Sequence, residues 1–310
     1  MRTARLLILT TIVLPAVAVA AQSPANSCPT ENGAAELYGP QMSQADTGRV
    51  YSYTLSADGR EFYFFKKVGD RRSEDYRIFR AVREGTGWSA PQQLRLGVDA
   101  SDLYPSLSAD GSRLVFSSYR PVPGDTSAHP NAHIYVSRRE GESWGTPELV
   151  RASRIGHYHS GLQQDASGTL TFRVTTPDWR SATDMMVAWD GRALAAAMTE
   201  APIKPALRYW QGLSGDSMHV WGAIMAPNGA ALLPISRVTQ PGGRRGPSRY
   251  FVSAPQPDGG WSPLVPAGGG LDAGSPNFAW FSADGCWLHY TRDYSQLMRV
   301  ASAVVLNTAG

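Results

Sequence analysis

The stretch YPSLSADGSRLVFSSYR, residues 104–120, decides the fold. Its Asp-Gly pair, Asp110 and Gly111, lies between a run that ends at Leu107 and the apolar run of residues 114–116. An Asp-Gly pair between two such runs is a strong signal for a β-hairpin, because the tight turn requires positive φ. The stretch therefore predicts two antiparallel strands joined at Asp110.

The same pattern recurs, so that the chain carries five copies of it. Each copy has an Asp or Asn at the turn, an apolar residue three positions earlier, and a glycine at or shortly after the turn. The turn residues are Asp58, Asp110, Asp165, Asn228 and Asp284. A further apolar run follows each hairpin, and an outer segment of the form Trp-x-x-Pro or similar comes next. Four short antiparallel strands per unit, repeated at spacings of 52, 55, 63 and 56 residues, predict the blades of a β-propeller.

The second copy also resembles a known family. Its Ser-Ala-Asp-Gly-x-x-Leu-x-Phe-x-Ser-x-Arg pattern is similar to the PD40 (WD40-like) repeats of the TolB-like propellers. The resemblance covers nearly all of the chain after residue 20; it is good in the first and fifth copies and degenerate in the third and fourth. It implies a propeller fold. The family includes partner-binding periplasmic proteins and carbohydrate- or peptide-processing enzymes, so the repeat indicates the fold better than the function.

The five copies predict a single all-β propeller of five four-stranded blades, with six blades as the alternative. The fifth copy ends near Ala303, which leaves no room for an outer strand. We expect residues 35–40 to supply that strand and to close the ring by pairing the two ends of the chain. Cys28 and Cys286 are the only cysteines, and we expect them to form a disulfide across the same joint; two free thiols are the alternative.

The first twenty residues predict export. Arg2 and Arg5 precede an apolar stretch that ends in Ala-Val-Ala at residues 18–20, the pattern of a signal peptide with its cleavage site. The stretch is short for a membrane span, and no later stretch is long enough, so we expect no transmembrane segment. The expected organisation is a signal peptide over residues 1–20 and one propeller domain over residues 21–310. The expected location is the periplasm or the exterior of the cell.

Composition excludes several classes of protein. A charged fraction of 18% together with 10% aromatic residues is atypical of disordered and coiled-coil proteins. The formal net charge of +3 falls to +1 when Arg2 and Arg5 are removed with the signal peptide, so we expect no nucleic-acid partner. We expect a monomer.

Candidate site residues gather on one face of the predicted propeller. We call it the upper face: the face on which the first strand of each blade begins. The Asp-Gly turns then lie on the lower face. Candidates on the upper face or in the central channel are Asp102, Tyr104, His157, His159, His219 and Asn277, and the arginines after second strands are Arg120, Arg173 and Arg292. Trp179, in a polar loop, is a candidate for stacking on a ligand. The histidines and arginines also have a structural interpretation, as hydrogen-bonded groups at the channel wall and between blades.

Common catalytic motifs are missing: the sequence contains no Gly-x-Ser-x-Gly, no P-loop, no dinucleotide fingerprint and no His-Glu-x-x-His. The sequence therefore favours a non-catalytic exported protein, without a cofactor, that binds a protein, peptide or glycan of the cell envelope. The alternative is a lyase or hydrolase that acts on an acidic glycan. In that case His157, His159 or His219 would act as base or metal ligand, and the arginines would hold substrate carboxylates.

Overall fold

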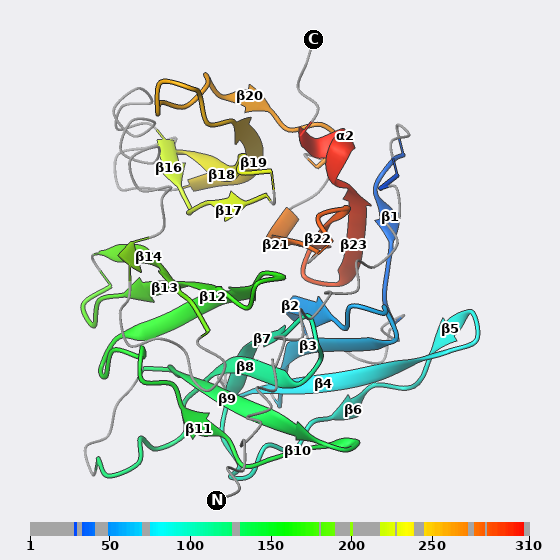
Figure 1. Ribbon diagram of the computed structural model, residues 1–310, viewed down its shortest axis with the longest axis vertical. Helices are drawn as coiled ribbons and strands as arrows, with labels where there is room; N and C mark the ends of the chain where they lie inside the picture. The colour runs from blue at the N-terminus through cyan, green and yellow to red at the C-terminus, as the bar shows by residue number, and fades with distance from the viewer. Residues whose placement is uncertain are drawn as a thin grey trace, which may run out of the picture.

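A computed structural model describes residues 28–29, 33–40, 49–69, 75–125, 131–179, 181–189, 199–200, 218–226, 228–238, 245–271, 276–282 and 284–306. These residues form five antiparallel sheets arranged in a ring, which is a five-bladed β-propeller (Figure 1). The predicted fold class and the number of blades are confirmed. The predicted signal peptide, residues 1–20, lies outside the described residues.

Each blade begins with its innermost strand. Blade 1 contains β2 (Val50–Leu55), β3 (Glu61–Val68), β4 (Asp75–Glu84), β5 (Gly87–Trp88) and β6 (Gln92–Gln93). Blade 2 contains β7 (Asp102–Leu107), β8 (Arg113–Ser118), β9 (His133–Glu140), β10 (Ser143–Trp144) and β11 (Glu148–Leu149). Blade 3 contains β12 (Tyr158–Gln164), β13 (Leu170–Thr175), β14 (Ala182–Val187) and β15 (Thr199–Glu200). Blade 4 contains β16 (Met218–Val220), β17 (Ile224–Met225), β18 (Ala231–Val238), β19 (Arg245–Ser253) and β20 (Val265–Pro266). Blade 5 contains β21 (Pro276–Phe281), β22 (Trp287–Arg292), β23 (Gln296–Ala301) and β1 (Glu36–Leu37), and the short helix α2 (Ser302–Leu306) follows it.

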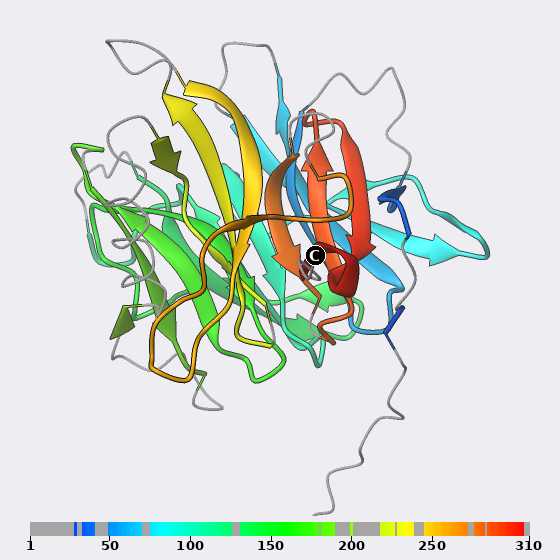
Figure 2. The ribbon, with the colours of Figure 1, turned by 90° about the horizontal axis from the view of Figure 1, so that it is seen from above.

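The core lies between neighbouring blades, because alternate residues of a strand point to opposite faces of its sheet. Along β3, Phe62 and Phe64 pack in a cluster with Leu297 of blade 5, whereas Tyr63 and Phe65 pack in a cluster with blade 2. Figure 2 shows the sheets standing side by side around the middle of the molecule. Large apolar side chains on both faces of each sheet therefore hold the ring together.

The Asp-Gly turns have the positive φ expected from the sequence at the glycine alone. In the first copy the Gly59 amide donates to the carbonyl of Ser56 at 2.8 Å, and only the glycine has positive φ, at 67°. The Asp58 carboxylate accepts from the Ser56 hydroxyl and from the Arg60 amide. The turn is thus a four-residue loop that an aspartate side chain stabilises and that ends in a left-handed glycine.

The third copy contains the same turn with its polar residues exchanged. Asp165 occupies the position of the first serine, Ser167 that of the aspartate, and the Gly168 amide donates to the Asp165 carbonyl at 3.0 Å. The turn is therefore centred two residues later than the sequence alignment at Asp165 places it.

Replacing the turn glycine of the second copy measures the cost of this left-handed conformation. Gly111 has φ of 68°, and no heavy atom lies within 4 Å of the position that a Cβ would occupy. Gly111→Ala is therefore expected to lower the free energy of unfolding by about 1 kcal/mol through backbone conformation alone. Urea unfolding checks this, and an unchanged midpoint would contradict the role given to the glycine.

The ring closes as predicted. β1, from the beginning of the chain, pairs antiparallel with β23, with Glu36 opposite Arg299 and Leu37 opposite Met298 (Figure 1). The Arg299 guanidinium also donates to the Glu36 carboxylate at 2.6 Å. Blade 5 therefore takes its outer strand from the opposite end of the sequence.

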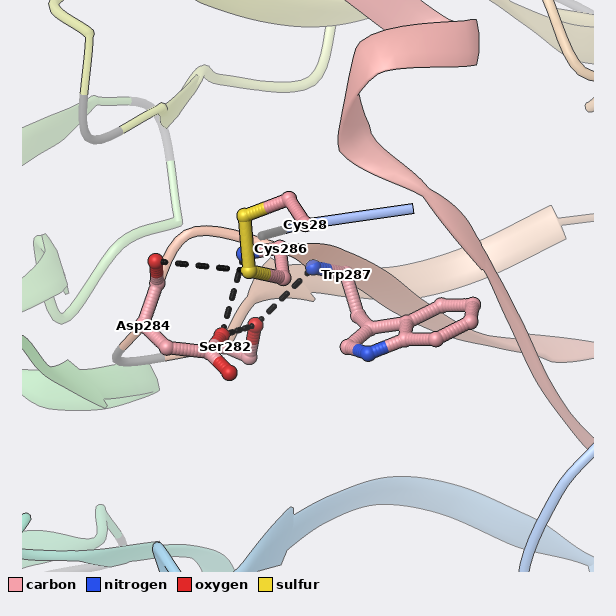
Figure 3. Close-up of a disulfide and its surroundings, with 5 residues drawn as sticks. All are labelled: Cys28, Ser282, Asp284, Cys286 and Trp287. Atoms are coloured by element: carbon pink, nitrogen blue, oxygen red, sulfur yellow. Dashed lines mark hydrogen bonds between the residues drawn. A yellow bond between two sulfur atoms is a disulfide. The ribbon is translucent and has the colours of Figure 1, made fainter. Parts of the chain in front are cut away.

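A disulfide joins Cys28 and Cys286 beside this closure (Figure 3). Cys286 follows the turn of the fifth copy, where its amide donates to the Asp284 carboxylate at 3.0 Å. The adjacent Trp287 amide donates to the Ser282 hydroxyl at 3.0 Å. The disulfide thus fastens the N-terminal segment to the turn of the fifth copy, and disulfides are typical of oxidising compartments. No helix among the described residues has the length and apolar character that crossing a membrane requires.

Candidate functional site

A cavity of about 640 Å³ opens at the centre of the ring, between blades 3 and 4. Its walls come from the first three strands of both blades, and aromatic side chains of blades 2 and 5 complete it. The apolar cluster of blade 4 reaches blade 3 only through the partly buried Met186 among the described residues. In the part of the chain that the structure describes, these two blades thus share fewer apolar contacts than other neighbouring blades do, and the cavity lies between them.

A bulge in the innermost strands shapes this cavity. In blades 1, 2, 3 and 5 the register between first and second strand shifts at a corresponding place, and in blade 4 the first strand breaks there into β16 and β17. Counting back seven residues from the turn glycine reaches Tyr104, Gly161, Gly222 and Phe278 in blades 2 to 5, and all four have positive φ. A bulge of this kind redirects a side chain. Here it turns the same position of four blades toward the cavity.

Glycine at two of these positions explains why the cavity exists. No heavy atom lies within 4 Å of the place where a Cβ on Gly161 would lie, so the space that Tyr104 and Phe278 fill in their blades stays open in blade 3. At Gly222 the corresponding space holds the guanidinium of Arg173. The distribution of glycine and aromatic residues at one repeat position therefore places the opening between blades 3 and 4.

Three aromatic residues of the cavity wall have a backbone conformation that is costly for them. Tyr104, Phe278 and Tyr294 have φ of 50°, 49° and 55°. Left-handed backbone at a bulky residue is rare, and such residues concentrate at functional sites. The ring of Phe278 lies 6.1 Å from that of Tyr104 and 6.2 Å from that of Tyr294, so the three form one aromatic wall.

Neutral polar groups accompany the aromatic wall. Burial raises the pKa of Tyr104 and of Tyr158, whose hydroxyls lie 3.4 Å apart, so both stay protonated at neutral pH. On the opposite side Ser236 accepts a hydrogen bond from the indole of Trp221 at 2.8 Å and lies 3.0 Å from the hydroxyl of Ser248. The cavity thus presents hydroxyl groups beside aromatic faces.

The charges in the cavity wall are already paired. Nε and Nη2 of Arg173 donate to the two carboxylate oxygens of Asp184 at 2.9 and 3.0 Å, and Nη1 donates to the carbonyl of Trp221. This bidentate pair uses the planar fork that would otherwise hold a ligand carboxylate. Among the described residues that line the cavity, Arg173 and Asp184 are the ones that carry a full charge, and together they are neutral.

The structure brings two of the predicted site residues, Tyr104 and Arg173, to this cavity. Asp102 and Arg120 instead form a buried ion pair at 2.9 Å, and Arg120 also donates to the Ser118 hydroxyl and to the carbonyl of Leu96 in the connection between blades 1 and 2. Burial raises the pKa of Asp102 although Arg120 acts in the opposite direction. This pair links blades 1 and 2, as the structural interpretation of the arginines expects.

The predicted histidines are absent from the described lining of the cavity. His159 is fully buried, its Nε2 accepts the amide of Arg154 at 3.1 Å, and its Nδ1 lies 3.0 Å from the carbonyl of Ala132. His157 lies in the preceding loop, with Nδ1 3.4 Å from the carbonyl of Ile155. His219 packs its ring edge-on against Trp221, with centroids 4.6 Å apart. None of the three is among the described lining residues, and their catalytic role stays a prediction.

The remaining candidates lie around the cavity rather than in it. Arg292 donates to the Tyr290 hydroxyl at 3.1 Å, and Asn277 pairs with Thr291 through the backbone of β21 and β22. The side chain of Asn277 lies outside the described part of the structure. Trp179 is 62% exposed, and its ring lies 4.9 Å from that of Tyr158.

Sequence reasoning missed Phe278, Tyr294 and Gly161. A signal for two of them exists, because aligning the repeats on their turn glycines places aromatic residues and glycines at one position. The described residues contain no cluster of three His, Cys, Asp or Glu side chains arranged to hold a metal ion.

A second hollow of about 810 Å³ lies on the outer rim, beside β1 and β5. Trp88 and Tyr38 contribute aromatic rings to it, and Arg83 and Arg299 contribute charge. Its aromatic residues have ordinary backbone conformations, so the central cavity is the stronger candidate.

Comparison with known proteins gives a fold likeness only. No protein-family model matches the chain, and no curated protein matches it. Among solved structures, a puromycin-hydrolysing peptidase of Mycobacterium tuberculosis is 14% identical with a TM-score of 0.45. The match covers 86% of this chain and 37% of the peptidase, so this chain spans well under half of the peptidase's length. A putative TolB of Agrobacterium tumefaciens is 16% identical with a TM-score of 0.44, over 78% and 69% of the two chains. The periplasmic gluconolactonase PpgL of Pseudomonas aeruginosa is 14% identical with a TM-score of 0.45, over 84% of each. Likeness at this level says nothing of function, which has to be argued from the site.

Proposed function

We propose that this protein is an exported, non-catalytic propeller that binds a neutral sugar ring of a cell-envelope glycan in the central cavity. The observation that carries the proposal is the wall of Tyr104, Phe278 and Tyr294, three aromatic residues with unfavourable backbone conformations around one cavity. Stability alone would favour glycine at these positions. Blades 3 and 4 have glycine, Gly161 and Gly222, at the repeat position that Tyr104 and Phe278 occupy in blades 2 and 5. A binding role accounts for keeping aromatic rings there.

The chemistry of the wall suits a sugar. The face of an aromatic ring carries negative charge density, which attracts the polarised C–H groups on the face of a pyranose. The hydroxyls of Tyr104, Ser236 and Ser248 can exchange hydrogen bonds with sugar hydroxyls, since a hydroxyl both donates and accepts. A concave, largely apolar site with a few polar groups is the usual form of a small-ligand site.

The charges argue for a neutral ligand rather than the acidic glycan of the alternative hypothesis. Arg120 and Arg173 already bind Asp102 and Asp184. Binding a ligand carboxylate at either of these arginines would require breaking its pair and leaving an aspartate without its partner. A neutral ring requires no such exchange.

Export and family membership belong to the same proposal. The Cys28–Cys286 disulfide supports a location in the periplasm or outside the cell. The Ser-Ala-Asp-Gly repeats support the TolB-like propellers as the family, and the leader at residues 1–20 together with a single domain over residues 21–310 completes the assignment.

Filling the cavity tests the binding role. Gly161→Phe places a ring at the repeat position that Tyr104 and Phe278 occupy in blades 2 and 5 with a similar φ, so the fold is expected to accept it. The variant should bind at least tenfold more weakly than the wild type, a loss of about 1.4 kcal/mol or more. Titration calorimetry against neutral cello-, malto- and chito-oligosaccharides measures this, with hexuronic-acid oligomers as the charged comparison.

The matched control is Gly111→Ala, which also introduces a side chain at a left-handed glycine but lies in a turn on the lower face. It should bind as the wild type does. Equal binding by Gly161→Phe and wild type would remove the cavity as the site, and binding of the charged oligomers alone would favour an acidic ligand. Chromatography of the same mixtures detects cleavage, and any turnover would favour the enzyme alternative.

A further inference from the structure

Trp179 occupies a position that the fold elsewhere gives to glycine. In its loop the Trp179 amide donates to the carbonyl of Thr176 at 2.9 Å, and the Thr176 amide donates to the carbonyl of Ser181 at 2.9 Å. The Thr176 hydroxyl donates to Asp178 at 2.6 Å and accepts the Ser181 amide at 3.1 Å. These are the hydrogen bonds of the Ser-Ala-Asp-Gly turn of the first copy, in which Gly59 stands where this loop has tryptophan.

The backbone of Trp179 is accordingly unfavourable. Its φ is 58°, close to the 67° of Gly59 and the 68° of Gly111. All five lower-face turns have glycine with positive φ at this point, the others being Gly168, Gly229 and Gly285. A bulky residue with such a φ is a conformational outlier, and outliers of this kind concentrate at functional sites.

The ring does not compensate by burial. Trp179 is 62% exposed, and it lies on the upper face in the loop between β13 and β14. Other exposed apolar side chains on this face include Val98 (59%) and Ile155 (41%) in the loops that precede β7 and β12, and Met218 (41%) at the start of β16. An exposed tryptophan in an unfavourable turn contributes little to folding, so its use is to be sought in binding.

Trp179 is connected to the cavity by one aromatic residue. Its ring lies 4.9 Å from the ring of Tyr158, at an angle of 36°. The Tyr158 hydroxyl in turn lies 3.4 Å from that of Tyr104, which lines the cavity. The three rings form a continuous path from the cavity to the surface of blade 3.

We infer that Trp179 and Tyr158 form a second subsite on the upper face, which stacks on the next ring of an oligosaccharide whose first ring lies in the cavity. The inference rests on the proposed function and names its ligand more closely, as a neutral chain of two or more sugars. Indole offers the largest aromatic face among the side chains, and adjacent rings in a glycan chain suit adjacent stacking sites.

Two substitutions separate binding from folding. Trp179→Gly removes the ring and relieves the backbone, whereas Trp179→Ala removes the ring and keeps the unfavourable φ. The test uses whichever of the cello-, malto- and chito-oligosaccharide series the wild type binds. Within that series the wild-type affinity should increase at least tenfold from the monosaccharide to the di- or trisaccharide. Both variants should lose this increase and keep the monosaccharide affinity within about twofold. Trp179→Gly should melt at the wild-type temperature or about 2 °C above it, and Trp179→Ala below Trp179→Gly.

Each other outcome overturns the inference. An unchanged gain with chain length in Trp179→Gly would mean that Trp179 contacts no sugar, while the cavity proposal stands if Gly161→Phe still abolishes binding. A clear fall in the melting temperature of Trp179→Gly would assign the tryptophan a structural role. Failure of the wild type to bind any saccharide of any length would refute the cavity proposal and the subsite together.

Discussion

Removing the Cys28–Cys286 disulfide is expected to lower the free energy of unfolding by about 5 kcal/mol. The two cysteines are 258 residues apart, so the link restricts nearly the whole unfolded chain. In the chain-entropy account the stabilisation grows with the logarithm of the closed loop, which gives about 5 kcal/mol for a loop of this length. Because β1 is only two residues long, the pairing that closes the ring depends strongly on this link.

Guanidinium unfolding of the Cys28→Ala/Cys286→Ala double variant measures this effect. The wild type in reducing agent serves as a second sample and should match the variant, which would show that the lost bond rather than the new side chains is responsible. A decrease below about 1 kcal/mol would mean that the five blades hold the ring closed without the disulfide.

Mild acid is expected to destabilise the protein strongly, through two buried histidines. Burial lowers the pKa of His159 to about 4. Burial, assisted by the charge of Arg299, lowers the pKa of His289 to about 3. In the unfolded chain both histidines have a pKa near the ordinary 6.5. Below this pH the unfolded state therefore binds protons at these two histidines, whereas the folded state does not until the pH approaches the lowered pKa values. The stability is complete above this value and falls as the pH decreases below it.

The expected size follows from linkage. Each histidine lowers the free energy of unfolding by about 1.4 kcal/mol per pH unit below pH 6.5, so the pair lowers it by roughly 4 kcal/mol by about pH 5. Carboxylates of ordinary pKa remain ionised in both states over this window, which leaves the histidines as the main source of the change. Urea unfolding at half-unit steps of pH measures the slope, and equal stability at neutral pH and at about pH 5 would contradict the prediction.

The fold was largely predictable because its signals are local. The turn of residues 108–111 has glycine at one position and an aspartate before it, and a glycine preceded by Asp or Asn recurs in four of the five lower-face turns. The closure by residues 35–40 could be predicted because the fifth copy has too few residues for a fourth strand. The disulfide could be predicted because the chain contains two cysteines. The sequence did not reveal the form of the turn. The backbone of Asp110 does not adopt positive φ, and its carboxylate instead accepts a hydrogen bond from the Ser112 amide.

The site was predictable only in part because it depends on contacts between blades. Tyr104 was found from its place ahead of the first strand, and it lines the cavity. His159 matches Tyr104 only in the alignment at Asp165. Counted back from the turn glycines it corresponds instead to the buried Asp102, and its ring lies against Ala132 and Arg154. The third turn is centred two residues later than that alignment places it, which is visible in the hydrogen bonds of the turn.

The pairing of β1 with β23 also determines when the molecule can finish folding. Glu36 lies opposite Arg299, so β1 has no strand to pair with until the last part of the chain has been synthesised. Contacts of such long separation form slowly, and a sheet edge left unpaired meanwhile is prone to associate with other chains. We therefore expect a truncated chain that ends before β23 to collect as an aggregation-prone intermediate, in which β1 and β22 both lack the strand that pairs with them.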